Sequence, residues 1–250
     1  MILFEDRAST VLYKVLSVIE NKKFLLPLNI CPIVPDTLIK ANKEFEFIDI
    51  SLDTLCMSQN KALKKIQDDN SIDGILFVKT FGIEFNIQPF YKKIKEINNN
   101  VFIIDDMCLC VPRFNYDIEN SYADMSFFSS GYSKYVDIDY GGYGFIEDKK
   151  FRKNFQDTSK NKYFLEYKKT IIDRMKPIKM HKDELNCIYK VNIPRKYHWE
   201  MSLRIGGFHF WQITRMRFYK PYSTKRIYLP VVTIHRLIIN IKTIRCKILM

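Results

Sequence analysis

The sequence predicts an α/β fold in which helices cover both faces of a mainly parallel sheet. Apolar runs of strand length alternate with segments of helical periodicity through the first 105 residues, and this alternation is typical of βαβ units. The runs at residues 74–78 and 101–104 are continuously apolar, as in strands that are covered on both faces. Apolar residues form 47% of the 250-residue chain, which is enough for a substantial core.

The alternation begins close to the N-terminus. A stripe of apolar residues at helical spacing predicts a helix at residues 9–20, and Ser9 or Thr10 is a candidate cap for its start. An apolar run that ends at Pro27 predicts a short buried strand. A short helix after Pro35, a strand marked by two phenylalanines and a helix with three inward apolar residues follow, and they cover residues 34–42, 45–49 and 58–67.

The same pattern continues to residue 150 and then weakens. The strand at 74–78, a helix at 87–97 and the strand at 101–104 are followed by a strand at 125–129 and another after Gly141-Gly142. A helix is predicted at residues 163–176, and no element is predicted from Asn192 onward. We therefore expect an α/β domain at residues 1–150 and a short, poorly defined C-terminal region at residues 151–250.

Charge separates the same two regions. The net charge is +12, but residues 1–150 carry −5 and residues 151–250 carry +17. No acidic residue follows Glu200. This break in composition indicates that the end of the chain is a different kind of segment from the sheet-forming part.

Several classes of protein are not expected. The N-terminus turns charged within five residues, unlike a secretory signal, and the longest late apolar run is interrupted by His235, Arg236 and Lys242. Six cysteines in such a chain indicate reduced thiols and a cytoplasmic protein. Cys108 and Cys110 have the wrong spacing for a zinc site and are expected to pack as small apolar residues, so no metal is predicted.

Polar residues follow three of the predicted strands. Ligands of parallel α/β sheets lie beyond the carboxyl ends of the strands, which places Asp106, Ser129 and the turn at 79–82 on one rim. Lys134 follows Ser129 by five residues. A strand-end acid, a strand-end serine and a loop lysine are what an enzyme needs to hold an aldehyde cofactor as a Schiff base.

Four blocks within residues 7–148 resemble the DegT/DnrJ/StrS family of sugar aminotransferases, which depend on pyridoxal 5'-phosphate (PLP). They are similar in order and spacing to the family's proline-helix-strand block, its aromatic-glycine turn, its acidic strand end and its serine-to-lysine segment with a following glycine pair. In this chain the blocks are residues 26–50, 73–82, 103–106 and 128–142.

The resemblance implies a three-layer, aspartate aminotransferase-like domain of fold type I and a role for each site residue. Lys134 is implied to bind the PLP aldehyde and move protons, and Asp106 to keep the pyridine nitrogen protonated. Ser129 is implied to bind the phosphate, together with Ala8 and Ser9, which stand where the family has glycine and threonine at a helix start. Asp105 competes with Asp106, but alternation along a strand allows only one of them to face the ring.

Plainer interpretations stay open beside these roles. Lys134 could be a solvated surface lysine, Asp106 could cap a turn, and Ser9 could be an ordinary helix cap. The chain also departs from the family pattern around the cofactor. Ala8 replaces a glycine, residues 29–31 offer no aromatic ring for stacking, and Lys79 and Leu109 stand where histidine and glutamine are common.

The function implied by the resemblance is amino transfer from an amino acid, such as glutamate, to a nucleotide-linked keto-sugar by a homodimer. One alternative is a non-catalytic relative that binds a ligand or partner. Another is a basic adaptor for nucleic acid, because aromatic and basic residues are interleaved at positions 208–226. The favoured interpretation of that last segment is a basic edge that covers the α/β core. The four histidines, all after residue 180, fit no zinc pattern.

Overall fold

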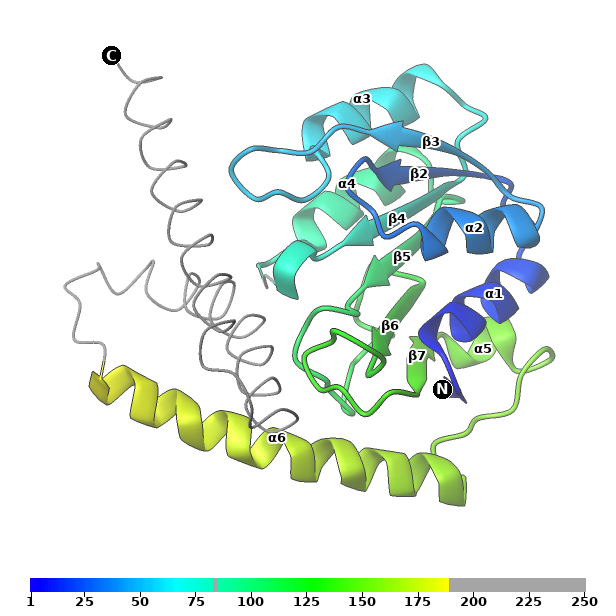
Figure 1. The fold of residues 1–250 in the computed structure, drawn as a ribbon. Coiled ribbons are helices and arrows are strands. Elements are labelled where there is room, and N and C mark those ends of the chain that lie inside the picture. Colours follow the sequence, from blue (N-terminus) through cyan, green and yellow to red (C-terminus); the bar gives the residue numbers. More distant parts are fainter. Residues whose placement is uncertain (83–84, 189–250) are drawn as a thin grey trace, which may run out of the picture. The chain divides into compact units, whose positions relative to one another are not determined.

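The computed structural model describes residues 1–82 and 85–188, apart from the side chains of residues 148 and 177–188 (Figure 1). A seven-stranded sheet has the order β1-β7-β6-β5-β4-β2-β3. Strand β7 runs antiparallel to β1 and β6, and the other pairs are parallel. The predicted mainly parallel sheet is therefore confirmed. The strands are β1 (Ile2–Glu5), β2 (Lys23–Pro27), β3 (Glu44–Ile48), β4 (Gly74–Val78), β5 (Phe102–Asp106), β6 (Met125–Ser129) and β7 (Gly142–Ile146).

Helices cover both faces of the sheet and form two separate cores (Figure 1). The α1 face is covered by α1 (Ala8–Val18), α2 (Ile33–Lys40) and α5 (Asp148–Phe151). The α4 face is covered by α3 (Gln59–Asp68), α4 (Gln88–Ile97) and α6 (Lys162–Ile188). A short 3-10 helix, η1 (Thr80–Gly82), follows β4. This is the three-layer architecture that the sequence predicts.

Helix α1 forms because its apolar residues recur at helical spacing and are almost completely buried against the sheet. Truncating one of them, for example Leu16→Ala, is expected to cost about 2–5 kcal/mol of stability. The prediction that Ser9 or Thr10 caps this helix is wrong. The helix starts at Ala8, so Arg7 occupies the cap position without a side-chain cap hydrogen bond.

Strand β1 was not predicted from the sequence. Its four residues are followed at once by charged ones, and a run this short carries no recognisable period. It forms because it pairs antiparallel with β7, from Ile2 with Phe145 to Glu5 with Gly142. The pairing brings the start of α1 to the same edge of the sheet as the end of β6.

Helix α6 belongs to the same core as the sheet. Phe164, Tyr167 and Ile171 are buried in the cluster of the α4 face, and the Tyr167 ring lies 5.9 Å from that of Tyr143 in β7. The helix predicted at residues 163–176 is confirmed and is longer than predicted. The core thus extends past residue 150 into α6, so the division at residue 150 stays a prediction about sequence regions.

The basic end of the chain, with its aromatic residues 208–226, lies outside the described residues. Within the part that the structure describes, no helix has both the length and the hydropathy needed to cross a membrane.

Candidate functional site

The carboxyl ends of β5 and β6 and the first turn of α1 meet at one edge of the sheet. Asp106 ends β5 and lies in register with Phe127 of β6, while Ser129 ends β6 and pairs with Gly142 of β7. Side chains alternate along a strand, so Asp106 and Ser129 share the α1 face with the core residues two positions before them. Two of the predicted site residues are thus brought to one face and one edge.

The neighbouring Asp105 lies on the opposite face. Its carboxylate is completely buried and forms an ion pair with Lys79, whose Nζ lies 3.1 Å from Oδ2. The buried Tyr91 of α4 lies beside it, and burial, then the Asp105 charge, raises the pKa of the Tyr91 hydroxyl. Burial also raises the pKa of Asp105 itself, although Lys79 opposes this. Asp105 therefore has a structural role, as the partner of Lys79 in a buried ion pair beneath α4.

Asp106 is buried as well, but on the α1 face. Its Oδ1 accepts a hydrogen bond from the backbone nitrogen of Cys108 at 2.9 Å. Burial raises its pKa, and this rise is opposed first by the Cys108 N–H and then by the positive charge of Lys134. A cationic partner stabilises the ionised form of a buried carboxylate such as this one. The protonated ring nitrogen of a bound pyridine would be one.

Lys134 lies half-buried in the loop between β6 and β7. Its charge lowers the pKa values of both Asp106 and Cys108, against the effect of their burial. The loop is held by hydrogen bonds from Lys134 N to Gly131 O at 3.3 Å and from Ser133 N to Asp137 Oδ2 at 3.2 Å. Ser133 has a positive φ of 68°, so this turn adopts a conformation that few side chains favour.

Tyr167 of α6 supports the same loop and was not identified from the sequence as a site residue. Its hydroxyl lies 2.8 Å from Ser130 Oγ, and Ser130 Oγ donates to Tyr140 O at 2.7 Å. Gly141 has a φ of +92°, and a Cβ on it would lie 2.3 Å from the Tyr167 ring. Helix α6 thus fixes the conformation of the lysine loop, and no local pattern could have revealed a contact between such distant residues.

The glycine pair has a second role at the start of α1. A Cβ on Gly142 would lie 2.2 Å from the backbone nitrogen of Ala8, so only glycine allows the helix to begin this close to β7. Ala8 is buried, and Ser9 is half-buried in the first turn. Both predicted residues therefore lie at the helix start where the resemblance places them.

Ser129 lies beside Gly131, just after the end of β6. Gly131 N donates to Ser129 Oγ at 3.4 Å, and a Cβ on Gly131 would lie 3.8 Å from the same oxygen. Helix N-termini and hydroxyl groups are common phosphate ligands, so the Ser129 hydroxyl and the start of α1 have the donor groups that the phosphate of PLP needs.

The departures from the family pattern also have structural roles. Asn29 donates its side-chain amide to Leu55 O at 2.9 Å and so ties two loops together instead of offering a ring. A Cβ on Gly82 would lie 2.2 Å from the carbonyl oxygen of Leu109, so the backbone after Asp106 packs directly on the turn at η1. Burial raises the pKa of Cys110 to about 12, which is consistent with the prediction that this cysteine packs as an apolar residue.

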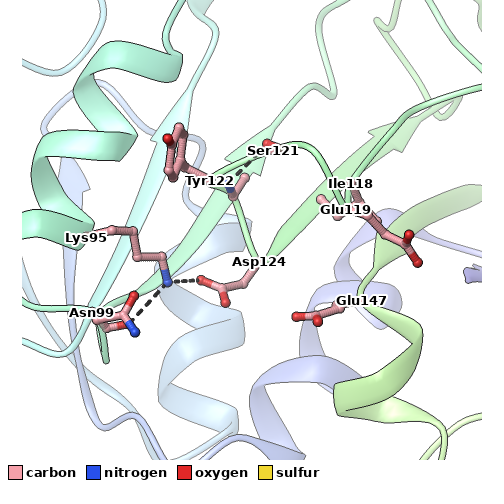
Figure 2. A pocket seen from close by; sticks show the side chains of 9 residues that line it. Lys95, Asn99, Ile118, Glu119, Ser121, Tyr122, Asp124 and Glu147 are labelled. Carbon is pink, nitrogen blue, oxygen red and sulfur yellow. Dashed lines mark hydrogen bonds and ion pairs between the residues drawn. The ribbon is translucent and has the colours of Figure 1, made fainter.

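A hollow of about 220 Å³ lies at the opposite edge of the sheet, away from these residues (Figure 2). Asp124 is at its centre. Its Oδ2 accepts from Lys95 Nζ at 2.8 Å and from Ile103 N at 2.9 Å, and its Oδ1 accepts from Lys150 Nζ at 3.0 Å. This carboxylate joins α4 and α5 to the start of β5, which is a structural role. Among the described residues, no group of histidine, cysteine and acidic side chains could hold a metal ion.

Comparison with known proteins supports the fold. The sequence matches no protein-family model and no curated protein sequence. A solved structure from Bacillus cereus, described as a PLP-dependent aminotransferase, has a TM-score of 0.52 at 20% identity and covers 60% of this chain and 42% of its own. The sugar aminotransferase CalS13 from Micromonospora echinospora has a TM-score of 0.51 at 12% identity, with coverage of 61% and 43%.

A third structure, 3-amino-5-hydroxybenzoic acid synthase, has a TM-score of 0.52 at 13% identity and covers 61% of this chain and 40% of its own. This chain therefore spans less than half the length of these three proteins. The α/β domain, with its seven-stranded mixed sheet, has the fold that PLP-dependent enzymes of fold type I share.

Proposed function

We propose that this chain binds PLP at the edge where β5, β6 and the start of α1 meet, and that it transfers an amino group from an amino acid to a nucleotide-linked keto-sugar. One observation carries the proposal. The predicted residues Asp106 and Ser129 lie on one face of adjacent strands, and the charge of Lys134 acts on Asp106 from the next loop. The fold supports the choice of cofactor, and the sugar substrate rests on the resemblance.

Each residue has one role in the proposed reaction. When bound, PLP supplies an aldehyde that joins to amines and a ring that accepts electrons. Lys134 Nζ would hold the cofactor through its aldehyde carbon and would move the proton at the α-carbon of the donor amino acid. Asp106 keeps the pyridine nitrogen protonated. The Ser129 hydroxyl and the backbone at Ala8 and Ser9 bind the phosphate.

The experiment that tests the proposal identifies the modified lysine. The protein is incubated with PLP and reduced with borohydride, and its peptides are analysed by mass spectrometry. We expect the pyridoxyl group on Lys134, and we expect Lys134→Ala to lose both this adduct and the visible absorbance of the bound cofactor. Lys160, an exposed lysine outside the site, provides the control variant Lys160→Ala, which should keep both.

Lys79 is the rival, because it also follows a strand at this edge of the sheet. A reduced adduct on Lys79, or no adduct on Lys134 in folded protein, would overturn the proposal. The resemblance also implies a homodimer, and light scattering of the purified protein tests this part separately.

A non-catalytic relative is the second candidate, and the position of Asn29 favours it. The segment that carries a stacking ring in the family is used here to join two loops, so the cofactor ring would lack one of its usual contacts. Adding glutamate to the PLP-loaded protein separates the two functions. An aminotransferase forms 2-oxoglutarate and the amine form of the cofactor, whereas a binding protein keeps its PLP spectrum unchanged.

A further inference from the structure

The residue directly before α1 is Arg7, and its backbone is fixed. It has an extended conformation, with φ −142° and ψ 145°. Its carbonyl oxygen accepts from Thr10 N at 3.1 Å and from Val11 N at 3.2 Å. A side chain that caps a helix start accepts hydrogen bonds from the free N–H groups of the first turn. A guanidinium group has donors only, so the Arg7 side chain makes no cap hydrogen bond.

The guanidinium group lies close to Gly131. Its Nη1 lies 3.6 Å from the point that a Cβ on Gly131 would occupy, and Ser129 Oγ lies 3.8 Å from the same point. Two polar groups from distant parts of the chain thus lie close to the same point beside Gly131. Among the described residues, Arg7 has no carboxylate partner, so its planar set of donors is available to a ligand.

The chemistry of these groups favours a phosphate dianion. A guanidinium group binds phosphate oxygens through paired, charge-assisted hydrogen bonds, and a hydroxyl group and the start of a helix stand beside it. We propose that Arg7 is a ligand of the cofactor phosphate and supplies the positive charge of this subsite. This inference rests on the proposed function, since the phosphate is that of PLP.

Arg7 also explains how the site tolerates alanine at position 8. The Cβ of Ala8 limits how closely a ligand approaches the backbone at the start of α1, and this weakens binding by N–H groups. A charged side chain one residue earlier reaches the phosphate from the side and offsets that loss. Phosphate binding by this chain therefore depends on the Arg7 side chain as well as on the start of α1.

The test compares PLP with pyridoxal, which lacks the phosphate. Dissociation constants for both are measured by absorbance titration on the full chain and on the Arg7→Gln, Arg7→Lys and Arg174→Gln variants. Arg7→Gln should weaken PLP binding by about 10- to 100-fold, the usual effect of losing hydrogen bonds to a charged group, and should leave pyridoxal binding unchanged. Arg7→Lys should lie between, because lysine keeps the charge without the paired donors.

Arg174 is an exposed arginine of α6, and Arg174→Gln should bind both compounds as the parent does. Inorganic phosphate should compete with pyridoxal 5'-phosphate less effectively in Arg7→Gln than in the parent. An unchanged ratio of PLP to pyridoxal affinity in Arg7→Gln overturns the role of Arg7 and leaves the proposed function standing. A parent protein that binds neither compound overturns the proposed function and this inference with it.

Discussion

Asp105 and Asp106 are consecutive residues of one strand, yet their surroundings differ in almost every respect. Asp105 lies on the α4 face, sealed in an ion pair with Lys79 beneath Tyr91. Asp106 lies on the α1 face, where its partners are a backbone N–H group and the charge of a loop lysine. Burial raises the pKa of both carboxyls, so burial alone does not distinguish a structural acid from a candidate functional one.

The difference arises from what covers each face at the edge of the sheet. On the α4 face, Tyr91 lies over the strand end and Lys79 neutralises the charge. On the α1 face, the helix begins at this edge, so its N-terminus lies beside the strand ends. The acid beneath α4 is thus held in an ion pair with Lys79, whereas the acid near the start of α1 accepts a hydrogen bond from the Cys108 N–H group.

The largest expected effect on stability comes from removing one partner of the buried ion pair between Asp105 and Lys79. Asp105→Ala leaves Lys79 buried without its partner and should lower the free energy of unfolding by about 3–5 kcal/mol. Asp106→Ala should cost much less. Chemical denaturation of both variants provides the measurement. The double variant Asp105→Leu/Lys79→Met should recover most of the loss, and equal costs for the two aspartates would contradict the comparison.

Close packing at the start of α1 gives the next largest effect. Gly142→Ala places a Cβ 2.2 Å from Ala8 N, so the helix must shift, and we expect a loss of about 1–3 kcal/mol in denaturation experiments. The matched control is Gly131→Ala, whose Cβ would make only ordinary contacts. This control should fold normally but bind PLP more weakly relative to pyridoxal. A stable Gly142→Ala variant with unchanged PLP affinity would show that the helix start is not part of the site.

A gain in stability is expected for Asp106→Asn. Because burial raises the pKa of Asp106, the folded state is favoured while this carboxyl is protonated, and that advantage is lost as the pH rises through the folded pKa. At pH 7 the ionised carboxylate therefore costs stability. Asparagine should raise the unfolding free energy by about 1 kcal/mol, and the gain should shrink as the pH falls toward about 4. Destabilisation at pH 7 would argue against a poorly solvated charge.

The smallest effect concerns the support of the lysine loop. Tyr167→Phe removes the hydroxyl that lies 2.8 Å from Ser130 Oγ and keeps the ring against Gly141. The expected loss is about 1 kcal/mol, the usual net value of one hydrogen bond, measured by thermal unfolding. Tyr163→Phe, at an exposed position of the same helix, should change nothing.

The fold could be predicted where apolar periodicity is strong, and the exceptions share a cause. The strands at 74–78 and 125–129 were predicted with the bounds that the structure gives. Strand β1 was missed because its formation depends on pairing with β7, about 140 residues later. The start of α1 was misplaced by one residue because its cap is the backbone of Arg7, without the side-chain bond by which caps are recognised.

The candidate site could be predicted in its local parts only. Alternation along β5 correctly separates Asp105 from Asp106, because neighbouring side chains of any strand point to opposite faces. The pairing of Lys79 with Asp105, the contact of Tyr167 with Gly141 and the approach of Arg7 to Gly131 each join distant segments. No local pattern encodes such contacts. The catalytic and binding roles of Lys134, Asp106, Ser129, Ala8 and Ser9 remain predictions.

The contact between Tyr167 and the Ser130–Gly141 turn also limits how far the gene can be shortened. A polypeptide that stopped at residue 150 would still contain every strand of the sheet, but it would lack the ring and hydroxyl that hold this turn in place. The smallest autonomous piece able to present Lys134 in a defined position therefore reaches at least through the second turn of α6. The last strand of the sheet is therefore not the C-terminal boundary of the unit that holds the Lys134 loop in place.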